Sequence, residues 1–303
     1  GRGLITWAGK EPRDLPPDLA CLRIEDGFIR SRGLGAKLVP PMSLVADDLG
    51  IYYDPTRPSR LEKLIATPID AAARNRAEVM LTAIRSAHVS KYNLSAANVP
   101  LPNHPNRVLV PGQVEDDASI RLAAGKVDTN LALLRAARAA HPDGFIVYKP
   151  HPDVEAGLRK GAIPAEQLLE LADLVATQAD PIHLIAQCDR VFTMTSTLGF
   201  EALLRGKPVT CTGAPFYAGW GLTTDLGVTP QRRNIYPRPD IIQLCYATLI
   251  AYPRYIDPVT GAPCPPEIVL HRLIKGHAVK TRTALRILSK IQGQFASLAH
   301  WWR

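Results

Sequence analysis

Short hydrophobic runs alternate with amphipathic stretches along most of the chain. The runs are rich in Val, Ile, Leu and Phe and are bounded by Gly, Pro or acidic turns, as buried strands are. In the amphipathic stretches apolar residues recur every three to four positions, which predicts helices. Strands are expected at 4–8, 20–24, 43–46, 51–53, 107–110, 145–148, 174–176, 190–193 and 208–211. Helices are expected at 59–65, 70–91, 130–140, 166–171, 182–186 and 198–205.

This alternation predicts an α/β protein made of two domains. Strands that alternate with helices form parallel sheets covered on both faces. Prolines gather between Pro100 and Pro105, where the chain is extended and a helix cannot continue. We therefore expect two Rossmann-like domains, residues 1–105 and 106–267, which face a central cleft. A helical tail at 268–303 follows them.

The net charge of +8 is concentrated in the tail. After Glu267 the chain has seven Lys or Arg residues and no acid, which leaves about +1 for the rest. Apolar residues alternate with these cations, and Trp301 and Trp302 close the segment. Such a helix is typical of an anionic membrane surface, although packing against the first domain is the alternative. A nearly neutral body argues against a nucleic-acid partner.

Cysteine usage and hydropathy narrow the class of protein further. The five cysteines are odd in number, and no two form a CxxC pair. A disulfide framework or zinc site is therefore not expected, and a reducing compartment fits better. We expect no metal and no bound cofactor. No apolar run approaches the ~18–20 residues of a membrane span, and the N-terminus has no signal-peptide pattern.

Two loops that follow predicted strands carry the chemistry of a phosphate site. The first contains Lys149 and His151, stiffened by Pro150 and Pro152. The second is a hydroxyl-rich turn at 193–197 that opens a helix, whose N-terminus attracts anions. Each feature alone has an ordinary explanation: the first could be a rigid surface loop, and the second could be a helix cap. Together, on one edge of a parallel sheet, they favour a nucleotide phosphate.

Two acidic motifs need a separate explanation. Glu25 and Asp26 follow a buried strand, which suits proton transfer at an acceptor hydroxyl but also suits a solvated turn. Glu115, Asp116 and Asp117 stand beside the predicted phosphate site, where they would repel phosphate. A metal site, a carboxylate nucleophile of a retaining transferase, and acids that complement a helix dipole are the three interpretations.

Several long runs resemble the KpsC family of bacterial capsule β-Kdo transferases. They occur in the family's order from about residue 20 to 265. The runs are 23–31 (RIEDGFIRS), 41–54 (PMSLVADDLGIYYD), 110–120 (VPGQVEDDASI), 148–153 (YKPHPD) and 215–222 (PFYAGWGL).

The resemblance implies a GT-B fold, a CMP-β-Kdo donor and retention of configuration. It also implies a phospholipid-linked oligo-Kdo acceptor at the cytoplasmic face of the inner membrane. Asp117 falls on the family's nucleophile, and Glu25 and Asp26 fall on its acid/base motif. The positions that match contacts to CMP are Lys149, His151, Pro152, Ser196, Thr197 and, for the ribose, Glu201.

Full KpsC carries two such modules, and this chain has the length of one, so the companion module is expected outside it. The sequences at 113–118 and 149–152 resemble those of the second module, which implies β-(2→7) rather than β-(2→4) transfer. The sugar carboxylate needs a cation, and Arg30, Arg32 and Arg121 are the candidates. A transferase for another CMP-activated acidic sugar and a non-catalytic nucleotide-binding module are the alternatives.

Overall fold

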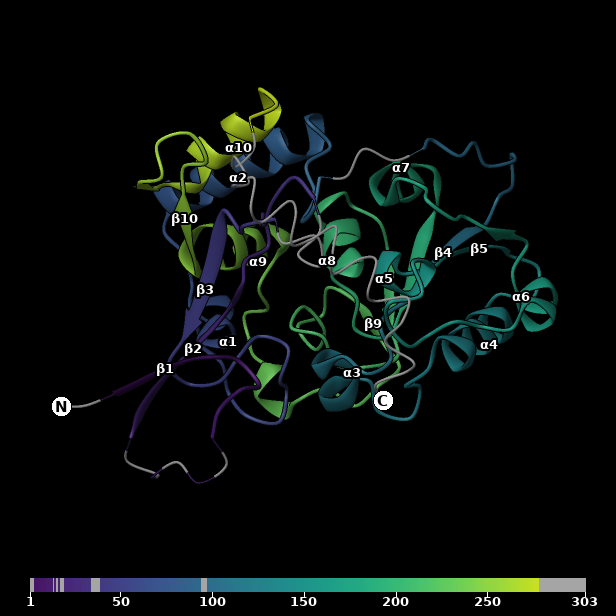
Figure 1. The fold of residues 1–303 in the computed structure, drawn as a ribbon, viewed down its shortest axis with the longest axis horizontal. Helices are drawn as coiled ribbons and strands as arrows, with labels where there is room; N and C mark the ends of the chain where they lie inside the picture. Colours follow the sequence, from purple (N-terminus) through teal and green to yellow (C-terminus); the bar gives the residue numbers. More distant parts are fainter. Residues whose placement is uncertain are drawn as a thin grey trace. The chain divides into compact units, whose positions relative to one another are not determined.

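The computed structural model describes residues 3–12, 14, 16, 19–33, 39–93 and 97–277 (Figure 1). The chain forms two compact units, each assembled from separated stretches of sequence. The first contains residues 1–51, 69–94 and the chain from 245 onward, and the second contains 52–68 and 95–244. The boundary expected after residue 105 therefore falls inside the second unit.

The second unit is built on a parallel sheet of the order β6-β5-β4-β7-β8-β9. All of its strand pairs are parallel, as expected for strands that alternate with helices. This is the strand order of doubly wound nucleotide-binding folds. The strands are β4 (Arg107–Pro111), β5 (Phe145–Lys149), β6 (Leu174–Val175), β7 (Arg190–Thr193), β8 (Val209–Cys211) and β9 (Thr224–Asp225).

Helices cover both faces of this sheet (Figure 1). Apolar residues of β4 and β5, such as Val108 and Ile146, are fully buried against Leu133 and Leu134 of α4. Their removal from water stabilises the unit by about 1.5–3 kcal/mol for each large side chain. The second unit contains the helices α1 (Arg60–Ala66), α3 (Ala118–Ala123), α4 (Asn130–Ala140), α5 (Pro152–Glu155), α6 (Ala165–Leu171), α7 (Pro181–Gln187) and α8 (Thr197–Leu204) and the 3₁₀ turn η2 (Gln231–Arg233).

The first unit has a mixed sheet of the order β1-β2-β3-β10-β11. Only β1 and β2 pair in parallel among its described strands, whereas β2–β3, β3–β10 and β10–β11 are antiparallel. The parallel sheet expected for residues 1–105 is therefore a wrong prediction. The strands are β1 (Gly3–Trp7), β2 (Ala20–Asp26), β3 (Ser43–Asp47), β10 (Pro253–Ile256) and β11 (Pro263–Cys264).

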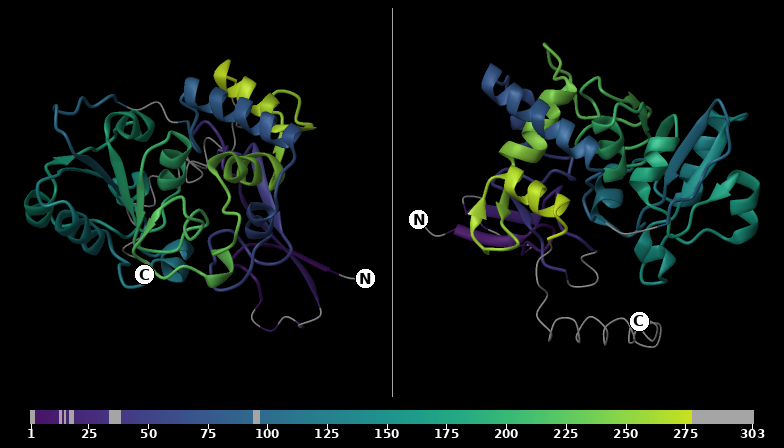
Figure 2. Two further views of the ribbon diagram at one scale, coloured as in Figure 1. Left: turned by 180° about the vertical axis from the view of Figure 1, so that it is seen from behind. Right: turned by 90° about the horizontal axis from the view of Figure 1, so that it is seen from above.

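The part of the chain that begins at Cys245 completes this first unit. Residues 253–255 pair with β3, and the Tyr252 hydroxyl donates to Asp47 over 2.8 Å. Figure 2 shows α10, in yellow, within this unit, and Arg76 of α2 forms a bidentate ion pair with Glu267 of α10. Long-range pairing of this kind leaves no local pattern in the sequence. The helices of this unit are α2 (Ala71–Ser86), the π-helical η3 (Tyr246–Ala251) and α10 (Pro266–Ile274). The short helix α9 (Ile241–Cys245) belongs to the second unit except for Cys245.

Most local predictions are confirmed, with two exceptions. Ser59 and Glu62 form the expected capping box at the start of α1. Residues 51–53 are a turn rather than a strand, and the helix expected to reach residue 91 ends at Ser86. In the predicted tail, α10 is observed and residues 278–303 lie outside the described part of the chain. None of the helices among the described residues is long and apolar enough to span a bilayer.

Candidate active site

Three loops of the second unit meet at one edge of its sheet. Strands β5, β4 and β7 are neighbours, so the segments that follow them leave from adjacent carboxyl ends. These segments are residues 112–117, 150–151 and 194–196. The chain crosses from β4 toward β5 on one side and returns to β7 on the other, and ligands bind at such switch points. The predicted phosphate loops and the acidic loop therefore share one location.

Gln113 ties the acidic loop to the loop after β7. Its amide nitrogen donates to the Thr195 hydroxyl over 2.9 Å, and its amide oxygen accepts from the Thr195 backbone N–H over 2.9 Å. Both residues are buried. A buried, two-way bond of this kind fixes the separation of the two loops. Gln113 lies within a motif of the sequence, but its role cannot be predicted from that motif because its partner lies 82 residues away.

Asn130, the first residue of α4, anchors the acidic loop through hydrogen bonds. Its side chain is fully buried, accepts from the Gln113 N–H over 2.8 Å, and donates to the carbonyls of Gln113 and Gly161. The Glu115 carboxylate accepts from the Asn130 backbone N–H over 2.7 Å, at the first turn of α4. The first of the three acids is thus used to cap a helix, as one interpretation of the sequence proposed.

The second acid, Asp116, forms an ion pair with Arg159. One carboxylate oxygen accepts from Nε over 3.2 Å and from Nη2 over 2.9 Å. The Arg159 guanidinium holds the pKa of Asp116 below its ordinary value. Arg121 donates from Nη1 to the Asp116 carbonyl over 2.5 Å. Asp116 is therefore occupied by neighbours on the same surface.

The third acid, Asp117, is the one whose charge remains uncompensated. It is the N-cap of α3 and accepts from the Ser119 N–H over 3.2 Å. No Lys or Arg side chain of the described residues pairs with it. Its charge nevertheless acts on His151, whose pKa it raises against a larger lowering by burial. Asp117 and His151 therefore lie close enough to interact, as their loops on adjacent strands require.

His151 caps the short helix α5. Its Nδ1 accepts from the Asp153 N–H over 3.1 Å, and Pro152 occupies the first helical position, where a missing N–H costs nothing. Burial lowers the pKa of His151, opposed by the carboxylates of Asp153 and Asp117. The ring is therefore neutral near pH 7, and because Nδ1 accepts, the proton resides on Nε2. Nε2–H is left to donate to a ligand.

Lys149, which was expected to bind phosphate, does not project freely from the sheet edge. Its side chain is only 5% exposed, and Nζ donates to the Pro150 carbonyl over 2.8 Å and to Glu155 over 3.2 Å. Burial lowers the pKa of Lys149, and the Glu155 carboxylate opposes this. In the described structure Lys149 holds the loop that carries His151.

The turn at 194–196 is fixed from two sides. Ser196 is the N-cap of α8 and accepts from the Leu198 N–H over 3.2 Å, and Thr197 is the first residue of the helix. The hydroxyl of the fully buried Tyr217 donates to the Ser196 carbonyl over 2.6 Å. Gly199 leaves room for that ring, since a Cβ there would lie 2.2 Å from the Tyr217 hydroxyl. The free N–H groups of the first turn of α8 point to this edge.

Glu201 lies one turn further along α8 and is 6% exposed. The second unit therefore contains every residue that the resemblance assigned to CMP, within the segments 149–152 and 196–201. It also contains Asp117. Gln113 and Tyr217 are the residues that sequence reasoning missed, since both act through partners distant in the chain.

The other two predicted catalytic residues, Glu25 and Asp26, belong to the first unit. They are the last two residues of β2, and they pair with Val45 and Leu44 of β3. Successive side chains of a strand point to opposite faces, so the two carboxylates do not share a face. Asp26 forms an ion pair with Arg30, and its other oxygen is buried without a partner among the described residues. Arg30 is thus already paired within its own unit.

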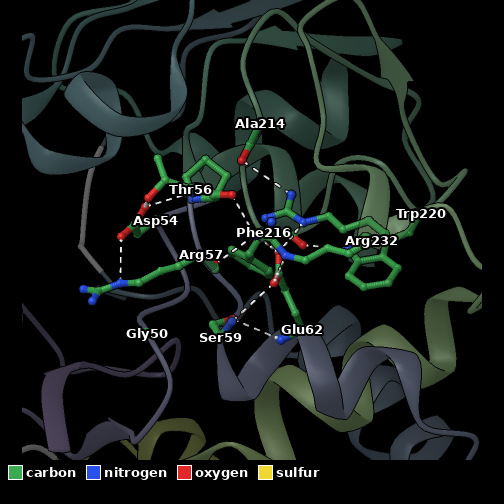
Figure 3. A network of polar contacts seen from close by, with 12 residues as sticks. Gly50, Asp54, Thr56, Arg57, Ser59, Glu62, Ala214, Phe216, Trp220 and Arg232 are labelled. Atoms are coloured by element: carbon green, nitrogen blue, oxygen red, sulfur yellow. Dashed lines mark hydrogen bonds and ion pairs between the residues drawn. The ribbon is translucent and has the colours of Figure 1, made fainter. Parts of the chain in front are cut away.

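A second network of charges in the second unit lies around Glu62 (Figure 3). The Glu62 carboxylate accepts from Arg232 Nε over 2.8 Å and from Arg233 Nε over 2.7 Å. Arg233 also donates to the carbonyls of Pro215 and Ala218, and it is almost fully buried. Much of the run at 215–222 therefore serves to surround an arginine. This network joins residues 52–68 to the loops after β8.

Known proteins resemble this chain over most of its length. It is 48% identical over 259 residues to the capsule polysaccharide modification protein LipA of Neisseria meningitidis serogroup B, a match covering 84% of this chain and 36% of LipA. It is 44% identical over 240 residues to the lipopolysaccharide-processing protein LpsZ of Rhizobium meliloti, covering 77% and 54%. The chain thus spans about a third to a half of the length of these relatives.

Two solved structures from Thermosulfurimonas dismutans are similar in fold and sequence. The KpsC β Kdo 2,4 transferase superposes with a TM-score of 0.76 at 39% identity, covering 84% of this chain and 80% of that one. The KpsC β Kdo 2,7 transferase gives 0.75 at 37%, covering 90% and 84%. The family model for capsule polysaccharide biosynthesis proteins matches residues 17–94 and 71–255. This chain therefore belongs to the capsule polysaccharide biosynthesis protein family.

Proposed function

We propose that this chain is a retaining β-Kdo transferase of the GT-B type. It transfers Kdo from CMP-β-Kdo to an oligo-Kdo phospholipid during capsule synthesis. The proposal is supported by the likeness to two solved modules described as β Kdo transferases and by the doubly wound sheet of the second unit. The second unit binds the donor, and the first unit supplies the acceptor side.

The donor phosphate lies between the loop at 150–151 and the start of α8. His151 donates from Nε2, and the first N–H groups of α8, with the Ser196 and Thr197 hydroxyls, supply further donors. Preorganised donors of this kind contribute about 2.7–4 kcal/mol each to stabilisation of a transition state. They neutralise charge on the departing CMP. Lys149 supports this site indirectly, because it holds the loop that carries His151. Glu201 contacts the ribose.

Asp117 is the nucleophile. In the first displacement its carboxylate oxygen bonds to the anomeric carbon C2 of Kdo, and the bond from C2 to the phosphate oxygen breaks, releasing CMP. In the second displacement an acceptor hydroxyl attacks C2 and the ester bond to Asp117 breaks. Two inversions at one carbon give net retention.

The proton released by the acceptor hydroxyl goes to a carboxylate of the first unit. Glu25 and Asp26 are the candidates, and because they point to opposite faces of the sheet, one of them alone takes this role. Asp26 is paired with Arg30 within the first unit. Substituting each carboxylate by its amide separates the two, since only the acid/base loses its rate.

One observation carries the proposal: of three consecutive acids at the sheet edge, two are occupied and Asp117 is left with an uncompensated charge beside His151. A pure phosphate site gains nothing from such a charge. The test is incubation with CMP-Kdo and a synthetic Kdo acceptor, with the linkage of the product determined by NMR. We expect a β-Kdo product.

The NMR experiment also decides the linkage and the donor. We propose β-(2→7) transfer from the motifs at 113–118 and 149–152; the two solved modules match about equally well and do not favour either linkage. Turnover of a different CMP-activated acidic sugar, with CMP-Kdo inert, would replace the donor assignment. Binding of CMP without turnover of any donor would contradict an enzymatic role.

The acceptor determines where the protein acts. A phospholipid-linked oligo-Kdo chain places the reaction at the cytoplasmic face of the inner membrane, and the basic residues after 267 suit contact with anionic lipid. Because the chain spans 36% of LipA, we propose a companion Kdo transferase module outside it. Flotation with liposomes, with and without the residues after Gly276, tests the membrane contact.

A further inference from the structure

An acidic sugar donor presents a second anion next to the reacting carbon. In a 2-keto sugar acid such as Kdo the carboxylate is bonded directly to the anomeric carbon. A carboxylate nucleophile such as Asp117 therefore approaches a carbon that already carries a negative group. Two like charges a few ångströms apart repel strongly where water is excluded. A cation beside the nucleophile is needed to make this approach favourable.

The segment after α5 brings a cation to this place. The Glu115 N–H donates to the Lys160 carbonyl over 3.1 Å, and Asn130 donates to the Gly161 carbonyl over 2.8 Å. The Arg159 N–H donates to the Asp153 carbonyl over 3.2 Å, two residues from His151. Residues 159–161 thus run between the acidic loop and the loop of His151. The backbone around Arg159 is therefore held against both the acidic loop and the loop that carries His151.

The Arg159 guanidinium is oriented but only partly used. Nε and Nη2 share one oxygen of Asp116, the residue next to Asp117 in the chain. The side chain is 41% exposed, and Nη1 has no hydrogen-bond partner in the part of the chain that the structure describes. The charge of Arg159 reaches His151, whose pKa it lowers, while Asp117 raises it. Arg159 and Asp117 therefore both lie within electrostatic reach of His151.

Other cations are less suited to this task. Lys149 is buried between the Pro150 carbonyl and Glu155. Arg121, a candidate from the sequence, directs Nη1 to the carbonyl of Asp116, and Arg30 is paired with Asp26 in the other unit. Arg159 was not among the sequence candidates, because it lies 43 residues from Asp116.

We propose that Arg159 binds the carboxylate of the acidic sugar and that Asp116 orients it for this contact. The proposal rests on the proposed function and names the residue that selects a carboxylated donor. A guanidinium held at two of its nitrogens presents a fixed N–H edge, which matches the planar geometry of a carboxylate. Asp116 acts as a positioning residue, and Arg159 contacts the substrate.

The test compares the donor with CMP alone, since CMP has the phosphate and lacks the sugar carboxylate. We expect Arg159→Gln to lower kcat/KM for CMP-Kdo about 100-fold, the size of a lost charge-assisted contact. Inhibition by CMP changes less than twofold. Arg159→Lys recovers part of the loss, and Asp116→Asn lowers kcat/KM about tenfold through misorientation. Partial rescue and the donor-against-CMP difference separate recognition from a structural effect.

Arg76→Gln is the matched control. Arg76 and Glu267 form an exposed ion pair of nearly the same exposure, 43% and 41%, against 41% and 40% for Arg159 and Asp116. We expect kcat/KM within twofold of the unchanged chain. Equal weakening of CMP and CMP-Kdo by Arg159→Gln would assign the guanidinium to the phosphate and overturn the inference, as would unchanged kinetics. Absence of transfer by the unchanged chain would contradict the proposed function instead.

Discussion

Two groups of opposite charges in the second unit differ in how completely their charges are compensated. Around Glu62 the carboxylate and Arg233 are 7% and 1% exposed, and Arg233 has further carbonyl partners (Figure 3). At the sheet edge Arg159 and Asp116 are about 40% exposed, and Asp117 has no cationic partner among the described residues. Both groups come from arginines and acids that the sequence alone ranks alike.

The difference separates structure from chemistry. A charge whose partners are all protein groups stabilises one arrangement of the chain and has nothing left for a ligand. A charge left half-satisfied at the carboxyl ends of parallel strands is available to one. The comparison predicts that changes around Glu62 alter stability, and that changes at the sheet edge alter turnover.

The largest effect is expected from Asp117→Asn. Transfer should fall at least ~10³-fold, because the amide is a poor nucleophile, while Asn keeps the N-cap of α3. The melting temperature and CMP inhibition should stay close to those of the unchanged chain. Turnover assays with CMP-Kdo and mass spectrometry of the intact protein, which should show a sugar adduct only when Asp117 is present, check this.

Asp70→Asn is the control for that substitution, since Asp70 caps α2 with a bond of 2.8 Å to the Ala73 N–H. It should leave transfer unchanged. Near-normal transfer by Asp117→Asn would remove the nucleophile assignment and would weaken the distinction between the two groups of charges.

Glu62→Ala should destabilise the protein by about 3–5 kcal/mol, because it leaves Arg233 buried without its carboxylate. Burial already lowers the pKa of Arg233, and Glu62 opposes this. Urea unfolding followed by circular dichroism measures the change. Glu267→Ala, which removes a carboxylate from the exposed pair with Arg76, should cost below about 1 kcal/mol. Similar losses for both variants would show that burial does not set the difference.

His151→Asn should lower kcat/KM about 100-fold through loss of the Nε2 donor, while Asn preserves the cap of α5. Steady-state kinetics and CMP inhibition should both weaken, in contrast to Arg159→Gln. His88→Asn is the control, since His88 lies in the left-handed region at a φ of 52°, which Asn tolerates. A change confined to CMP-Kdo, with CMP unaffected, would move His151 away from the phosphate.

The smallest effect concerns pH. Burial lowers the pKa of His151 below its ordinary value of 6.5 in the folded state. In the window below 6.5 the unfolded chain therefore binds more protons, so stability declines as pH falls from 7.5 to 5.5. His141, whose pKa burial also lowers, adds to the decline. His151→Asn should make the measured slope shallower by the His151 share, and an unchanged slope would show that the ring protonates normally in the fold.

Local features of the fold were predictable because their causes are local. The capping box of Ser59 and Glu62, the strand at 145–149 and the helix at 130–140 depend on residues a few positions apart. The parallel sheet of the second unit follows from regular alternation. The mixed sheet of the first unit was mispredicted, because β3 pairs with β10 from more than 200 residues later, which no local pattern records.

The site divides in the same way. Hydroxyls, His151 and the run of acids were visible as residue types after strands. The identity of the unpaired acid was not, because it depends on Arg159 and Asn130 occupying its neighbours from other loops. Glu25 and Asp26 were adjacent in sequence, and only the extension of β2 through Asp26 showed that their side chains point apart.

By itself the sequence determined most strands and helices of the second unit, the loops that carry polar residues, and the likeness to capsule β-Kdo transferases. Tertiary structure decided which charges are compensated. A charge's availability depends on partners brought close by folding, and ion pairs and hydrogen bonds act over a few ångströms regardless of separation along the chain. For this reason Lys149, Glu62 and Arg159 acquired their roles only in the folded molecule.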